Sequence, residues 1–233
     1  MRISTPEFIA LMAMLVATVA ISIDAMLPAL PDIAATLTSE RPNNVQLILS
    51  SFIVGMSIGT LIVGPLSDSF GRKTVIYWGA GLYILASVIC IFASNLETVI
   101  VARLCQGFGA AAPRIVSQAL IRDLYSGRQM ARISSFVMMI FSIVPALAPL
   151  LGAGLMSIFA WQSIFVIFIV FSTLSTAWTG LRIQEPLAPE QRIPFRRAAF
   201  QAALVEIFSL GMVRISMLTM VFAYAMLFLS ILM

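Results

Sequence analysis

The chain has 233 residues, of which 61% are hydrophobic and 10% are charged, and it carries a net charge of +4. A soluble domain has roughly 25% charged residues, and a fold of this length has too little interior to bury so much apolar surface. The composition excludes a soluble enzyme, a disordered chain and, with two cysteines, a disulfide scaffold. We therefore expect a polytopic membrane protein, whose loop arginines explain its positive charge without nucleic acid.

Seven apolar runs are long enough to cross a membrane as helices, which takes about 20 residues. They cover residues 8–30, 45–66, 75–94, 98–120, 133–157, 162–181 and 215–233. The first run exceeds the length of a signal-peptide core, so we expect it to be retained. The very short connections at 95–97 and 158–161 predict two tight antiparallel hairpins.

The basic residues predict an orientation. Eleven of the fourteen lysines and arginines lie in one alternating set of connections, and the opposite set holds only Arg41. By the positive-inside rule, the N-terminus of this multi-pass protein is expected to be cytoplasmic.

The longest connection, 182–214, predicts a cytoplasmic connector between two bundles. Within it, 194–212 has helical periodicity and charge, which is typical of an amphipathic helix. Such a helix would lie on the membrane surface or simply link the bundles, and both alternatives stay open. We expect a six-helix bundle over 1–181, this connector, and at 215–233 the first helix of an incomplete second bundle. Six spans, a connector and six more spans is a known transporter plan.

Three charged residues fall inside the predicted spans, where charge is costly: Asp24, Arg103 and Arg114. With a rise of ~1.5 Å per residue, Asp24 lies ~24 Å along its outward span and Arg103 ~7–8 Å from the outer end of its inward span. The similar depth makes an Asp24–Arg103 pair possible. Arg114 follows Arg103 by 11 residues, so both share a helix face with Gly107. That face should line a polar cavity or pack on another helix; alternatively, Arg114 snorkels or caps carbonyls freed by Pro113.

The loop after the second span reads GPLSDSFGRK over residues 64–73. It closely resembles the signature loop of the major facilitator superfamily, except that Ser69 stands where the family usually has arginine. In physical terms, Gly64 would allow close helix packing, Asp68 would cap the start of the next helix and Gly71 would permit a tight turn.

Two further stretches resemble motifs of the same superfamily. RLCQGFGAA, from Arg103, is similar to a motif associated with proton coupling, and PALAPLLGA, from Pro145, is similar to the antiporter motif, although three of its glycines are replaced. Together with DAMLPALP at Asp24 and IRDLY at 121–125, they resemble the bicyclomycin-resistance (Bcr/CflA) type of multidrug/proton antiporter.

The resemblance implies an all-α membrane protein that exports small drug-like molecules in exchange for protons, as a truncated copy; the alternative is a fragment without transport activity. A seven-helix retinal pigment is excluded because the single lysine, Lys73, lies in a loop. The expected partners are a small-molecule substrate, protons, the lipid bilayer and a missing C-terminal half, with no nucleic acid, cofactor, metal or enzymatic activity. The implied site residues are Asp24 and Arg103 for proton coupling; Arg114, Gln106 and Gly107 for the substrate cavity; Gly64, Asp68, Gly71, Arg72 and Lys73 for the conformational motif; and Pro145, Pro149 and Gly152 for the antiporter-like motif.

Overall fold

The computed structural model describes residues 3–38, 42–194, 200–202, 205–206 and 209–220. The chain divides into two compact units, Met1–Arg192 and Ile193–Met233. All regular secondary structure in the described residues is helical, which confirms the expected all-α class.

The first unit contains six helices that are long and apolar enough to cross a membrane, the first of them interrupted. In chain order its elements are α1 (Thr5–Asp24), η1 (Leu27–Ala29), α2 (Leu30–Leu37), η2 (Pro42–Gln46), α3 (Leu47–Phe70), α4 (Arg72–Ile91), α5 (Leu96–Leu124), α6 (Gly127–Met156), α7 (Gln162–Arg182) and η3 (Pro189–Gln191). The first six predicted spans are therefore confirmed. Helices α5 and α6 extend past the predicted runs at their charged ends. The prediction followed apolar residues alone, whereas the helices continue into the charged residues beside them.

Local sequence signals explain where these helices begin and end. Ser4 caps α1 by accepting a hydrogen bond from the Glu7 backbone, and the Asn95 side chain accepts one of 2.8 Å from Thr98 to start α5. After Asp24 the chain passes through a short 3-10 turn at Pro28 and restarts as α2. Proline lacks the backbone donor that would continue α1.

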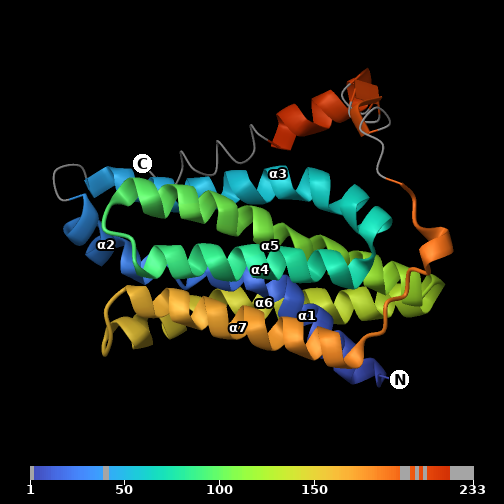
Figure 1. The fold of residues 1–233 in the computed structure, drawn as a ribbon, viewed down its shortest axis with the longest axis horizontal. Helices are drawn as coiled ribbons and strands as arrows, with labels where there is room; N and C mark the ends of the chain where they lie inside the picture. The colour runs from blue at the N-terminus through green and yellow to red at the C-terminus, as the bar shows by residue number, and fades with distance from the viewer. Residues whose placement is uncertain (1–2, 39–41, 195–199, 203–204, 207–208, 221–233) are drawn as a thin grey trace. The chain divides into compact units, whose positions relative to one another are not determined.

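Helix α5 is central to the bundle and packs against α1, α3 and α4. Figure 1 shows the long helices aligned, with α4 and α5 side by side. The predicted hairpin at 95–97 is confirmed by this packing. The one at 158–161 is wrong: α6 and α7 make few contacts, and α7 packs on α4 and α1 instead. The reason is that α1, buried along most of its length, packs against both α6 and α7.

Glycines bring α5 close to its neighbours. A Cβ added to Gly55 of α3 would collide with the backbone of Leu104, and one added to Gly107 would collide with Phe52. Gly79 and Gly109 play the same part between α4 and α5. Small residues at such crossings let membrane helices approach without side chains between them.

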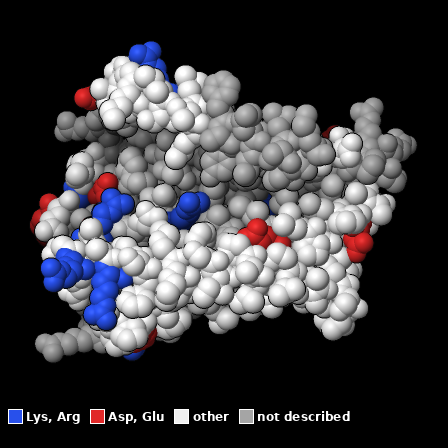
Figure 2. Space-filling model, turned by 180° about the vertical axis from the view of Figure 1, so that it is seen from behind, with Lys and Arg blue, Asp and Glu red and all other residues white. Residues whose placement is uncertain are grey.

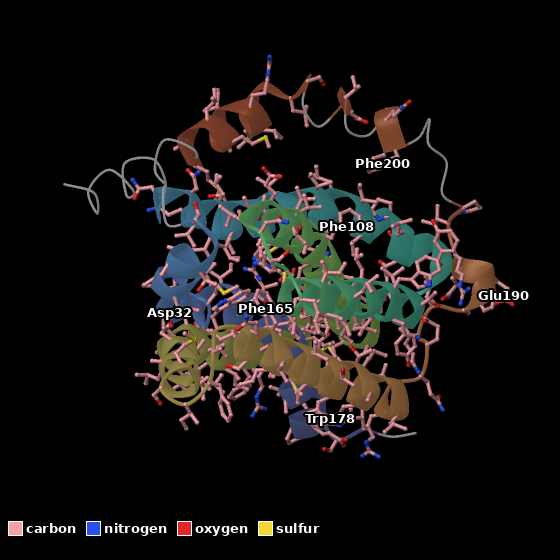
Figure 3. All side chains as sticks on the ribbon, turned by 60° about the vertical axis from the view of Figure 1, so that its left-hand side comes forward. Asp32, Phe108, Phe165, Trp178, Glu190 and Phe200 are labelled. Carbon is pink, nitrogen blue, oxygen red and sulfur yellow. The ribbon has the colours of Figure 1, made fainter. Side chains whose placement is uncertain are left out.

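The apolar interior has two clusters, one toward each end of the bundle. One includes Phe52 and Phe165, and the other includes Phe8 and Val116. Figure 3 shows Phe165 of α7 inside the bundle and Trp178 toward the other end of the same helix.

In the second unit, residues 200–202, 205–206, 209 and 211–220 are helical. The predicted amphipathic helix over 194–212 and the predicted span over 215–233 both lie partly outside the described residues. The division at 181 and 214 stays a prediction.

Candidate functional site

Buried polar side chains, a backbone carbonyl and an aromatic ring meet where four helices converge. We call this group the polar core network. It comprises Ser22 of α1, Ile48 and Phe52 of α3, Tyr83 and Ser87 of α4, and Arg103 and Gln106 of α5.

Arg103 is the centre of the network and is fully buried. Its Nη1 donates to Gln106 Oε1 at 2.6 Å, its Nη2 to the Ser22 carbonyl at 3.0 Å and its Nε to the Ile48 carbonyl at 3.4 Å. Its guanidinium carbon lies 4.3 Å from the centre of the Phe52 ring, in cation–π geometry. One side chain thus joins α5 to α1 and α3.

The hydrogen bonds continue from Gln106 into α4. Gln106 Nε2 donates to Ser87 Oγ at 2.6 Å, and Ser87 Oγ donates to the Tyr83 carbonyl at 2.8 Å. The Tyr83 hydroxyl is hydrogen-bonded to Ser22 Oγ at 2.5 Å, which closes the connection back to α1. Because buried polar groups are costly when unpaired, this closed set fixes the relative positions of α1, α4 and α5.

Asp24 is half-buried at the last residue of α1, two residues beyond Ser22. Because Arg103 bonds to the Ser22 carbonyl, Asp24 and Arg103 lie at a similar level along the bundle, as the sequence predicted. The possible ion pair between them is not formed: ion pairs within the described residues join Arg72 to Asp68, Arg72 to Asp123, and Arg182 to Glu7. Backbone carbonyls and Gln106 instead occupy the donors of Arg103.

The shared helix face of Arg103, Gly107 and Arg114 is confirmed, because all three residues meet α3. Gly107 lies against Phe52, and Arg114 Nη1 lies 3.6 Å from the sulfur of Met56. Gln106 and Gly107 are buried in helix contacts, whereas Arg114 is half-buried. The structure therefore leaves Arg114 as the accessible member of the expected cavity residues.

The antiporter-like stretch of α6 meets α1 beside Asp24. A Cβ added to Gly152 would collide with the carbonyl oxygen of Ala25. Pro145 and Pro149 lie inside α6 without ending it. Gly152 therefore allows α6 to approach the end of α1 closely.

A second polar group lies at one end of the bundle. We call it the charged clamp and define it as Ser67, Asp68, Arg72, Lys73, Asp123, Gly180 and Glu185. Arg72 donates to Asp68 at 2.5 Å, to Ser67 at 2.6 Å and to Asp123 at 2.8 Å. Because Asp123 belongs to α5, this arginine joins the α3–α4 turn to the end of α5.

Glu185 caps α4, a role that the sequence wrongly predicted for Asp68. Its two carboxylate oxygens accept hydrogen bonds of 2.9 Å from the backbone N–H groups of Arg72 and Lys73. Asp68 lies in the last turn of α3 and reaches Arg72 at i+4 instead. Lys73 Nζ donates to the Gly180 carbonyl at 3.0 Å, so the clamp also holds the end of α7.

The predictions for two glycines of the signature loop, Gly71 and Gly64, have different outcomes. Gly71 has φ of +98°, the left-handed region that glycine adopts readily, which confirms its predicted turn. Gly64 has no atom within 4 Å of an added Cβ, so the predicted close packing there is wrong for the described residues.

Basic side chains are distributed unevenly over the molecule. Figure 2 shows those on its face gathered mainly toward one end. Arg72, Lys73, Arg122 and Arg182 lie at helix ends. This asymmetry is what the positive-inside rule uses to orient a membrane protein.

The described residues thus form a bundle of helices long enough to cross a membrane, with a buried arginine network at its centre and a charged clamp at one end. The chain belongs to the Major Facilitator Superfamily, whose model matches residues 10–233.

Several curated proteins are similar to this chain. An uncharacterized MFS-type transporter, YdgK, of Bacillus subtilis is 37% identical over 186 residues, covering 79% of this chain and 46% of that protein. A bicyclomycin resistance protein homolog of Haemophilus influenzae is 35% identical, covering 75% and 44%. The multidrug resistance protein MdtL of Escherichia coli is 38% identical, covering 61% and 36%. The chain thus spans less than half the length of these relatives.

Solved structures show the same fold at low sequence identity. The human organic anion transporter MFSD10 matches with a TM-score of 0.66 and 15% identity, over 83% of this chain and 51% of that one. A D-xylose-proton symporter matches with a TM-score of 0.67 and 16% identity, over 88% and 53%.

Proposed function

We propose that the protein is a secondary active transporter, or part of one, that exports small drug-like molecules across the bacterial inner membrane in exchange for protons. Two relatives whose names contain "bicyclomycin resistance" and "multidrug resistance" support the substrate class. The basic helix ends support a cytoplasmic N-terminus.

One observation carries the proposal: two helices hold the end of α1 on either side of Asp24. Arg103 of α5 bonds to the Ser22 carbonyl, and Gly152 of α6 lies against Ala25. An ionisable residue within a membrane helix is costly and marks a functional site by default. Movement of α1 or α6 would change the surroundings of the Asp24 carboxylate, which is what a proton-coupled carrier requires.

The roles follow from these positions. Asp24 accepts the coupling proton, and the fixed charge of Arg103 acts on it when the helices rearrange. Arg114 faces the substrate cavity, with Gln106 and Gly107 forming the packed wall behind it. Pro145 and Pro149 would supply the points at which α6 bends during transport.

The charged clamp stabilises one conformation of the transporter. Arg72, held by Asp68, ties the α3–α4 turn to α5, and Lys73 ties it to α7. Gly71 gives the turn its shape. Gly64, whose added Cβ meets no atom of the described residues within 4 Å, would pack against a second bundle. Two bundles rocking about a central site would give alternating access, so we propose a C-terminal six-helix bundle as the partner of residues 1–181, joined through 182–214 and beginning at 215–233.

The proposal is tested in proteoliposomes that contain the purified protein. An imposed pH gradient should drive accumulation of bicyclomycin or ethidium, and Asp24→Asn should abolish it. Asp32→Asn, which removes an exposed carboxylate of α2, is the matched control and should transport normally. Accumulation that is equal with and without the gradient would contradict proton exchange, and no accumulation under any condition would support the alternative of an inactive fragment.

A further inference from the structure

A groove between α1 and α6 is not used by the proposed transport mechanism. Its volume is about 580 Å³, and it is lined by the first turns of α1 and the first half of α6. Its walls are mostly apolar, with Ile9 on one side and Ile133, Phe136 and Ile140 on the other. Among the described residues that line it, Arg132 is the single charged one.

Arg132 is available to a ligand. The guanidinium carbon of Arg132 lies 5.8 Å from the centre of the Phe136 ring, and Arg132 is exposed. It forms no ion pair and no side-chain hydrogen bond with any residue that the structure describes. A cation above an apolar wall, with no acidic residue among the described ones that line the groove, is complementary to an anionic group attached to a hydrocarbon chain.

The depth of the groove matches one leaflet of a bilayer. Arg132 is five residues from the start of α6, which is ~7–8 Å at the helical rise, and Ile140 is a further ~12 Å along. Half of the ~30 Å hydrocarbon core is ~15 Å. The arginine therefore lies at the level of lipid headgroups when Phe136 and Ile140 lie at the level of acyl chains.

We propose that this groove binds an anionic phospholipid, with Arg132 on its phosphate and one acyl chain against Phe136 and Ile140. The ligand comes from the leaflet on the clamp side of the membrane, because α6 begins at that end, directly after the α5 terminus that holds Asp123. In the orientation given under the proposed function, on which this step rests, that side is the cytoplasmic leaflet, where anionic lipids attract basic residues.

Quenching by brominated lipids tests the site in the intact protein. Phe136→Trp, made with the three native tryptophans replaced by phenylalanine, places a reporter in the groove and keeps the aromatic ring beneath Arg132. The protein is reconstituted in two kinds of vesicle that contain both phosphatidylglycerol and phosphatidylcholine. In the first only phosphatidylglycerol is brominated, and in the second only phosphatidylcholine is. Quenching of the tryptophan fluorescence is compared between the two. We expect phosphatidylglycerol to occupy the groove about fivefold more often than phosphatidylcholine, the ratio that one arginine provides near an anionic headgroup.

Two variants of this reporter protein make the result specific. Arg132→Gln should abolish the preference for phosphatidylglycerol, and Arg122→Gln, which removes an exposed arginine of α5 outside the groove, should keep it. Excess inorganic phosphate should not displace the lipid. Equal quenching by the two lipids, an unchanged preference in Arg132→Gln, or displacement by phosphate alone would overturn the proposal.

Discussion

The guanidinium of Arg103 donates a 3.0 Å hydrogen bond to the carbonyl oxygen of Ser22, 81 positions earlier in the chain. This bond joins α5 to α1 two residues before Asp24. The hydrogen bond between the Tyr83 hydroxyl and Ser22 Oγ joins α4 to the same residue and closes the network. The arginine therefore acts on the end of α1 through the backbone rather than through an ion pair. A rearrangement that breaks the Arg103–Ser22 bond would free the guanidinium to approach the Asp24 carboxylate.

Loss of the Gln106 amide should destabilise the bundle. Gln106→Leu keeps the approximate shape of the side chain but leaves Arg103 Nη1 without an acceptor and Ser87 Oγ without its donor. Unpaired buried groups cost about 1–3 kcal/mol, and more beside a charge. We expect the free energy of unfolding, measured by titration of detergent micelles with sodium dodecyl sulfate, to fall by about 2–3 kcal/mol. Gln118→Leu, at a half-buried position of the same helix, is the control, and an equal effect of both changes would contradict the network.

The α4–α5 crossing predicts opposite effects for two neighbouring glycines. Gly79→Ala places a Cβ against Ala112 and the Gly109 carbonyl and should destabilise the protein by about 1–3 kcal/mol. The added Cβ of Gly81→Ala meets no atom of the described residues within 4 Å. This change should leave stability unchanged or raise it by up to about 1 kcal/mol, because alanine favours the helix. Thermal unfolding of the purified protein compares the two; a lower unfolding temperature for Gly81→Ala than for Gly79→Ala would refute the packing.

The cap that Glu185 provides for α4 can be removed without touching the signature loop. Glu185→Gln keeps one acceptor oxygen but loses the carboxylate that accepts from both Arg72 and Lys73. Caps of this kind contribute about 0.5–2 kcal/mol, so we expect a loss of about 1 kcal/mol. Hydrogen exchange of the first turn of α4 should also become faster. Glu190→Gln, at an exposed residue of the same connector, should do neither.

Most of the architecture could be predicted because membrane helices are specified locally. Hydropathy over about 20 residues predicted the six spans of the first unit, and the short connection at 95–97 predicted that α4 and α5 pack as a hairpin. The turn at Gly71 and the shared face of Arg103 and Arg114 were also predicted, since glycine conformation and helical spacing are local properties.

The errors concern contacts between residues that are distant in sequence. Asp68 was the nearest carboxylate to the start of α4, but Glu185, more than a hundred residues later, reaches the free N–H groups because α7 packs on α4. The hairpin at 158–161 fails for a similar reason, as α1 packs against both α6 and α7. The pairing of Arg103 depended on carbonyls of Ser22 and Ile48, and sequence patterns do not show which backbone groups lie near a side chain.

The most direct test of the central claim, that Asp24 exchanges a proton for the exported molecule, is the release of protons on drug binding. The purified protein is mixed with bicyclomycin or ethidium in weakly buffered solution, and the change in proton concentration is measured for the wild type, Asp24→Asn and Asp32→Asn. We predict a release of about one proton per bound molecule from the wild type and from Asp32→Asn, and none from Asp24→Asn. Drug binding accompanied by the same release in Asp24→Asn as in the wild type would contradict the claim.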